Sequence, residues 1–161
     1  MKKLIILSFL VLSAFALNAQ SVTGSFQPIE NEARVNLVID LSATDIMGMT
    51  EEAFAEYEKD WKQDKKTILY LITSNANKMT DNNPRLGAYS DADYTIRLVI
   101  RAIDVKGNYD CDVILEKGED VIAKGIGLYS KGGKFGTKLN LMKDGAADTG
   151  KKLGRFISSQ L

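Results

Sequence analysis

A loop rich in glycine and lysine offers the most direct chance of binding chemistry in this chain. It reads Lys-Gly-Gly-Lys-Phe-Gly-Thr-Lys over residues 131–138, between a segment with strand periodicity and one with helical periodicity. Backbone amides of such a loop can hold an anion, and lysines add positive charge. Phe135 stands where a nucleotide-binding loop needs Ser or Thr to hold magnesium, so no nucleotide site is expected. The alternative is an exposed loop without a ligand. The candidate residues for a small anion or a glycan are Lys131, Gly133, Lys134 and Lys138.

Three carboxylates, Asp110, Asp112 and Glu116, form a second set of side chains that could do chemistry. A pair of carboxylates can perform the acid–base steps of a glycosidase. The preceding strand carries two arginines at matching positions, however, and one cross-strand register places Arg101 opposite Asp112 and Arg97 opposite Glu116. We therefore expect these acids to be structural ion-pair partners, with no catalytic residue among them.

The composition excludes several classes of protein. The 161 residues include 21 Lys and Arg, 21 Asp and Glu, and no His. Without an imidazole, Ser-His-Asp and Cys-His catalysis and His-ligated zinc are excluded. A formal net charge of zero gives no basic excess for nucleic acid. No acidic segment follows the calcium-loop pattern. We therefore expect a non-enzymatic protein with no cofactor, no metal site and no nucleic-acid partner.

Residues 1–20 have the pattern of a secretory signal peptide. Two lysines precede an apolar run over residues 4–17, and Ala19 is small enough to precede a cleavage site. The run is short for a bilayer, and no later stretch reaches about 20 apolar residues, so no transmembrane span is expected in the mature chain. A periplasmic or secreted location follows from this pattern. The single cysteine, Cys111, then lies in an oxidising compartment without a partner in the chain, and its alternating surroundings predict a buried strand position.

Periodicity divides the rest of the chain into the elements of a single domain, residues 33–161. Alternation of apolar and polar residues predicts strands, and apolar spacings of three and four predict helices. Thr50 followed by two glutamates is typical of a helix start, and residues 21–32 are expected to be an irregular lead-in. The order β-α-β-β-β-α predicts an α+β fold, an antiparallel sheet of about four strands with helices packed mainly on one face. The expected elements are strands at 33–42, 92–103, 109–116 and 121–129, a helical segment over 51–79 with a kink or a division into two consecutive helices at 63–66, and a helix over 139–161.

The same alternation predicts which side chains face away from the core of the sheet. They form an apolar strip flanked by charged residues, the usual composition of a docking surface. The alternative is that the helical segment 51–79 crosses this face and buries the strip. The candidate surface consists of Arg97, Val99, Arg101, Ile114 and Ile126.

Small residues recur at a spacing of four in the last predicted helix. Glycine costs roughly 1 kcal/mol per helix position relative to alanine, so Ala146, Gly150 and Gly154 need a packing reason. The preceding strand has small residues, including Gly125, on a single face. We therefore expect the three helix residues to contact the sheet directly.

The stretch 92–161 resembles a known family of envelope modules. Ala92-Asp93-Tyr94 opens a strand, a second strand ends at a glycine turn, and the third is followed by a helix that ends in Leu-Gly-x-Phe-Ile at 153–157. This arrangement resembles the α+β module of the TolB amino-terminal domain, of the curli-export lipoprotein periplasmic domain and of related penicillin-binding-protein activators. The chain departs from it in lacking a lipoprotein cysteine and in its loop at 131–138. The resemblance implies a non-enzymatic envelope protein that docks on partners.

These observations lead to one principal expectation about function. The chain is expected to be an exported, non-enzymatic envelope accessory protein that docks on an unidentified envelope protein. The alternative is a carrier of a small anion or glycan that uses the loop 131–138, and a carboxylate enzyme is a third hypothesis.

The signal pattern predicts that the mature protein begins at Gln20 or Ser21. Mass spectrometry of the protein purified from the compartment outside the cytoplasm would give a mass without the preceding segment, because signal peptidase removes it during export. A retained Met1 in the exported pool would contradict this prediction.

Overall fold

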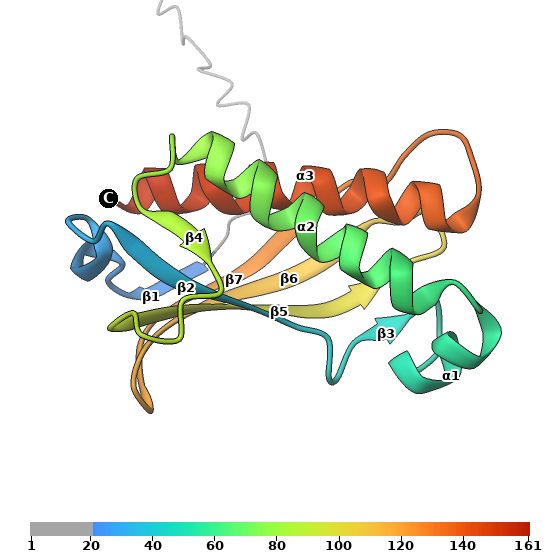
Figure 1. Cartoon of the computed structure of the whole chain (residues 1–161), viewed down its shortest axis with the longest axis horizontal. Coiled ribbons are helices and arrows are strands. Elements are labelled where there is room, and N and C mark those ends of the chain that lie inside the picture. Colours follow the sequence, from blue (N-terminus) through green and yellow to red (C-terminus); the bar gives the residue numbers. More distant parts are fainter. Residues whose placement is uncertain (1–20) are drawn as a thin grey trace, which may run out of the picture.

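A computed structural model describes residues 21–161, so the expected signal peptide at 1–20 lies outside the described residues. The described chain forms three α-helices, one 3-10 turn and seven strands (Figure 1). In chain order the elements are β1 (Ser21–Gly24), η1 (Gln27–Ile29), β2 (Arg34–Asp40), β3 (Asp45–Ile46), α1 (Glu51–Tyr57), α2 (Trp61–Met79), β4 (Arg85–Gly87), β5 (Tyr94–Ile103), β6 (Tyr109–Lys117), β7 (Asp120–Ser130) and α3 (Lys138–Gln160).

The seven strands form a mixed sheet, which corrects the expected antiparallel sheet of about four strands. Its order is β1-β7-β6-β5-β2-β4, and β3 extends the sheet alongside β5. The pairs β1–β7, β7–β6 and β6–β5 are antiparallel, whereas β2 pairs in parallel with both β5 and β4. The fold remains α+β.

The parallel pairs follow from the connection after β2. The helices α1 and α2 carry the chain from one end of the sheet back to the other, so the next strand runs in the same direction as β2. A helical crossover is the usual connection between parallel strands. The prediction of a helical segment is therefore confirmed. The sequence analysis did not predict that this crossover would make β2 parallel to its neighbouring strands.

Two short edge strands were also missed. The segment 21–32 is not an irregular lead-in, because β1 pairs with β7 through Ser21 opposite Ile126 and Gly24 opposite Ala123. Phe26 in the same segment is buried and meets Phe156 edge-to-face, with ring centroids 5.1 Å apart. The sequence before Phe26 has too few residues to show strand periodicity, which needs four or more alternating positions.

The register between β5 and β6 differs from the expected one by one residue next to the loop and by two residues beyond an irregularity between Ile100 and Ala102. Ile103 pairs with Tyr109, so the loop spans 104–108, and Val99 lies opposite Asp112 where Arg101 was expected. The Asp104 carboxylate accepts the backbone N–H groups of Lys106 and Asn108 at 2.8 and 3.0 Å, which stabilises this longer loop. Beyond the irregularity, the shift by two keeps each side chain on its expected face of the sheet, whereas Ile103 turns into the core.

Strand β7 is interrupted by two irregularities that change which of its side chains point inward. Gly127 has a φ of 85° and lies at the first irregularity, beyond which Leu128 turns into the core. At the second, Val121 lies opposite Glu116 and is exposed. A β-bulge of this kind adds one residue to a strand and reverses the alternation beyond it.

The helical segment breaks earlier than expected. Thr50 caps α1, and its hydroxyl accepts the N–H of Ala53 at 3.3 Å. The first helix ends before Glu58 and the second begins at Trp61, so the segment forms two consecutive helices, divided before the expected position at 63–66. Phe54 and Trp61 meet edge-to-face across the break, with centroids 5.0 Å apart. This aromatic contact anchors α1 to α2 and explains why the break lies before Trp61.

Helices α2 and α3 lie side by side across one face of the sheet (Figure 1). A Cβ atom added at Gly150 would overlap the carbonyl oxygen of Ile72, and one at Gly154 would overlap that of Ala76. These two glycines therefore contact α2, which corrects the expectation that they touch the sheet. The small residue Gly125 of β7 instead makes room for the ring of Phe156.

The substitution Gly150→Ala tests this helix contact. Alanine normally stabilises a helix by about 1 kcal/mol relative to glycine. Here the added methyl group must push α2 away, so we expect the free energy of unfolding to fall by about 1–3 kcal/mol. Urea unfolding measures the change, and Lys151→Ala on the exposed side of α3 is the matched control. A stabilised Gly150→Ala variant would show that the two helices do not touch at this point.

Candidate functional site

The sheet has one face without a helix among the described residues. Both long helices pack on the other face, and Figure 1 shows the broad surface of the strands open below them. We call this surface the open face. Its side chains come from alternate positions of β2, β5, β6 and β7, and they include all five residues of the expected docking surface.

Apolar and charged side chains alternate on the open face in two directions. One row across the strands reads Asp40, Val99, Asp112 and Ile126. The next row reads Val38, Arg97, Ile114 and Lys124. Diagonal neighbours on a sheet lie within reach of long side chains, so the apolar residues form a zigzag across four strands where an unbroken strip was expected. We call Val38, Val99, Ile114 and Ile126 the apolar zigzag.

The apolar zigzag is accessible to a partner. Val38, Val99 and Ile114 are half-buried by their charged neighbours, and 42% of Ile126 is exposed. Both long helices, α2 and α3, pack on the opposite face of the sheet. The alternative that the segment 51–79 buries this face is therefore wrong.

Ion pairs hold the charged side chains of the open face in place. Arg97 donates two hydrogen bonds of 3.0 Å to the Glu116 carboxylate, and its other nitrogen lies 3.8 Å from Asp40. Arg101 donates to Asp110 at 2.6 Å and lies 3.5 Å from Asp112. The register is not the expected one, yet the pairs of Arg97 with Glu116 and of Arg101 with Asp112 both form. Long arginine side chains reach diagonally across the strands.

The ion pairs also fix the charge states on this face. The hydrogen bond to Glu116 raises the pKa of Arg97, and that to Asp110 raises the pKa of Arg101. Hydrogen bonds from Ser42 lower the pKa of Asp40, and the nearby Arg97 guanidinium lowers it further. Arg97, Arg101 and Asp40 therefore stay ionised near neutral pH and contribute a fixed charge pattern.

The first three backbone N–H groups of the expected anion loop are occupied. The N–H of Lys131 donates to Asp148 at 2.9 Å, that of Gly132 to Asn108 at 2.9 Å, and that of Gly133 to the carbonyl of Leu141 at 3.4 Å. A Cβ at Gly133 would overlap the Asp144 carboxylate, so two acids border the loop. At residues 131–133, an anion would therefore meet two acids and no free amide.

The lysines of this loop do not converge. Lys138 turns toward α1, where its Nζ lies 5.1 Å from the ring centroid of Tyr57. Lys131 and Lys134 are exposed, and Phe135 at the tip is 89% exposed. The loop therefore presents an aromatic side chain to solvent without a cation cluster beside it.

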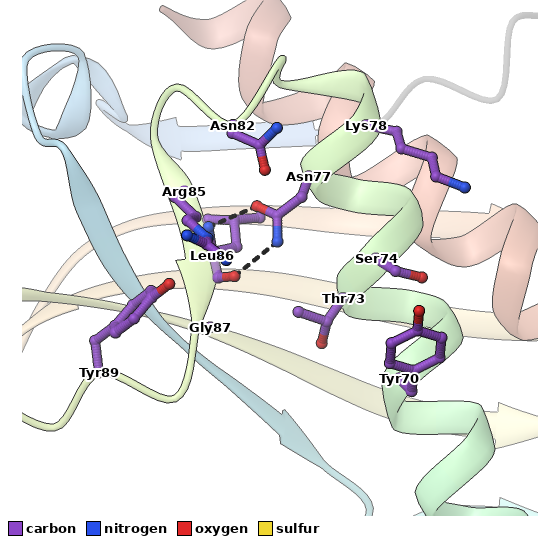
Figure 2. A pocket seen from close by; sticks show the side chains of 10 residues that line it. All are labelled: Tyr70, Thr73, Ser74, Asn77, Lys78, Asn82, Arg85, Leu86, Gly87 and Tyr89. Carbon is purple, nitrogen blue, oxygen red and sulfur yellow. Dashed lines mark hydrogen bonds between the residues drawn. The ribbon is translucent and has the colours of Figure 1, made fainter.

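A cleft that the sequence did not reveal lies between α2 and β4 (Figure 2). Its volume is about 480 Å³, and ten residues line it, none of them acidic. Tyr70 of α2 and Tyr89 beyond β4 lie on opposite sides of it, and the amide of Asn82 points into it from one end. Arg85 and Leu86 belong to β4, a strand of three residues that no periodicity could predict. We call this the α2–β4 cleft.

Among residues 21–161, no group of three or more His, Cys, Asp or Glu side chains is placed to hold a metal ion. None of the helices in this range combines the length and apolar character that crossing a membrane requires.

Comparisons with known proteins give little further information. No family model matches the chain, and no curated protein matches it. Among solved structures, it is similar to a dodecameric PelC variant from Paraburkholderia phytofirmans, with 11% identity and a TM-score of 0.41. The match covers 84% of this chain and 95% of the other. A likeness at this level supports no inference about fold or function, and it does not bear on the resemblance to the TolB-type module.

The buried position of Cys111 predicts an unreactive thiol. The side chain is fully buried in β6, and burial raises the pKa of its thiol far above the usual range. Because the thiolate is the reactive form, we expect no reaction with an aromatic disulfide reagent at pH 8 in the native protein and one thiol per chain after unfolding. Spectrophotometric thiol counting measures both. Rapid native reaction would contradict the buried strand position.

Proposed function

We propose that this protein is an exported, non-enzymatic accessory protein of the cell envelope that docks on another protein through its open face. The observation that carries the proposal is the apolar zigzag, which lies on a sheet face without a helix. Apolar groups among fixed charges on an accessible surface are typical of protein interfaces.

The charge pattern favours a folded protein as the partner. Arg97 and Arg101 are each shared between two carboxylates, so the open face does not carry a single sign of charge. A polyanion such as nucleic acid needs a basic surface, and this face does not provide one. A partner with its own apolar side chains would bury the zigzag, and its polar groups would meet the ion pairs at the rim.

A non-enzymatic role is supported by the state of the reactive groups. The carboxylates once considered for catalysis, Asp110, Asp112 and Glu116, are all engaged with arginines on a flat face. The single thiol is buried. The carrier function of the loop 131–138 has less support, because the amides of residues 131–133 are occupied. The export part of the proposal rests on the sequence of residues 1–20.

The substitution Ile126→Lys tests the docking surface. Asp112 lies opposite Ile126, so the new lysine gains an ion-pair partner and should change the free energy of unfolding by no more than about 0.5 kcal/mol. An aspartate at Val99 is less suitable because it would face Asp112 directly. We expect Ile126→Lys to weaken partner capture from the envelope fraction by about tenfold or more, since it places a charge in the apolar zigzag.

Val105→Lys is the matched control, because Val105 is 60% exposed in the β5–β6 loop, away from the open face. Capture should be quantified by mass spectrometry of the retained partner, with thermal unfolding of each variant. Equal capture by the wild type and the Ile126→Lys variant would refute docking through this face. A retained second copy of the chain alone would also refute the proposed heterologous partner.

A further inference from the structure

The geometry points to a second site: the α2–β4 cleft binds a sugar acid, a hydroxyl-rich ring that carries a carboxylate. This site lies at the β4 edge of the sheet, shares no residue with the apolar zigzag and does not depend on the proposed docking function. A volume of about 480 Å³ is in the range of small-molecule sites.

The two tyrosines provide flat surfaces for a ring. Tyr70 is 70% exposed on α2, and the ring of Tyr89 lies across the cleft from it (Figure 2). Tyrosine offers both an apolar face and a hydroxyl group, so it can pack against a ring and hydrogen-bond to its substituents. Tyr70 is exposed and Tyr89 is half-buried, and neither belongs to the hydrophobic core.

Tyr89 is held in place before any ligand arrives. Its ring packs closely over Gly87, where an added Cβ would lie only 3.0 Å from a ring carbon. The Arg34 guanidinium lies 5.2 Å from the ring centroid, and the Tyr89 N–H donates to the side chain of Asn36 at 3.1 Å. A side chain fixed in this way loses little conformational freedom on binding, which favours affinity.

The cleft also holds polar groups suited to hydroxyl groups. Thr73 points into the space between α2 and β4, and the Asn82 amide points into it from the end (Figure 2). Asn82 and Asp81 both have left-handed backbone conformations, with φ of 57° and 52°. This two-residue turn directs the Asn82 amide toward the cleft.

The charge of the cleft selects an anion. Arg85 and Lys78 line it, neither forms a salt bridge within residues 21–161, and no lining residue is acidic. Lys78 points away from the centre, which leaves Arg85 as the other cation among the lining residues (Figure 2). A guanidinium can donate two parallel hydrogen bonds to a carboxylate.

A bound peptide strand is disfavoured by the way β4 is closed. The outward N–H of Leu86 donates to the Asn77 side chain at 2.7 Å, and the Asn77 amide donates back to the Leu86 carbonyl at 2.8 Å. These are the groups that an added strand would need. Asn77 therefore blocks strand addition at this edge and leaves the cleft for a ligand recognised by side chains.

The test is to titrate the mature protein separately with four compounds and to monitor the ¹⁵N amide chemical shifts. The compounds are D-galacturonate, a trimer of galacturonate, neutral D-galactose and inorganic phosphate. We expect galacturonate to shift the amides of Thr73, Asn82, Gly87 and Tyr89, and to bind about tenfold or more tightly than galactose. Tighter binding of the trimer would identify a polymer as the source of the sugar acid, whereas equal binding would identify the free monomer.

Arg85→Gln should weaken galacturonate binding about tenfold or more, and Arg155→Gln, an exposed arginine of α3, should leave it unchanged. Gly87→Ala should weaken binding by displacing the Tyr89 ring without changing the charge. The proposal would be overturned by shifts outside the cleft, by equal responses to phosphate and galacturonate, or by an Arg85→Gln variant that binds like the wild type. Saturating galacturonate should not change partner capture, so failure of either proposal can be recognised separately.

Discussion

The close contact between α2 and α3 determines how the rest of the molecule is arranged. Gly150 and Gly154 have no side chain where the carbonyl oxygens of Ile72 and Ala76 approach, so the two helix backbones can pack at a short distance. Two helices packed this closely lie together on one face of the sheet. The glycine pair therefore allows both long helices to fit on the same face of the sheet, and the opposite face stays open.

The open face remains stable in water because its polar and apolar groups are interleaved. Each apolar side chain of the zigzag lies beside charged residues, and three of the four are half-buried by them. Arg97 and Arg101 each bridge two carboxylates across neighbouring strands. Exposed ion pairs contribute little stability individually, but shared pairs on a rigid sheet keep their geometry. The face can stay exposed until a partner covers it.

Local patterns in the sequence predicted the local parts of the fold. The cap at Thr50, the three strands of the meander and the last helix were all evident, because each depends on residues within about ten positions of one another. The parallel pairing of β2 with β5 joins segments about 60 residues apart, and no short-range pattern encodes it. The glycine stripe showed that a close contact was needed, but not which backbone would fill it.

The same distinction separates the two candidate sites. The residues of the open face were found from the sequence because a register error of two residues leaves each side chain on its face. The register error affected only which residues lie next to one another, so the apolar side chains form a zigzag where an unbroken strip was expected. The α2–β4 cleft depends instead on a three-residue strand whose place is set by β2 on one side and by Asn77 on the other. Asn77 supplies the hydrogen bonds that a neighbouring strand would otherwise give to Leu86. A strand of three residues held in this way leaves no periodic pattern in the sequence, so the cleft beside it could be found only from the structure.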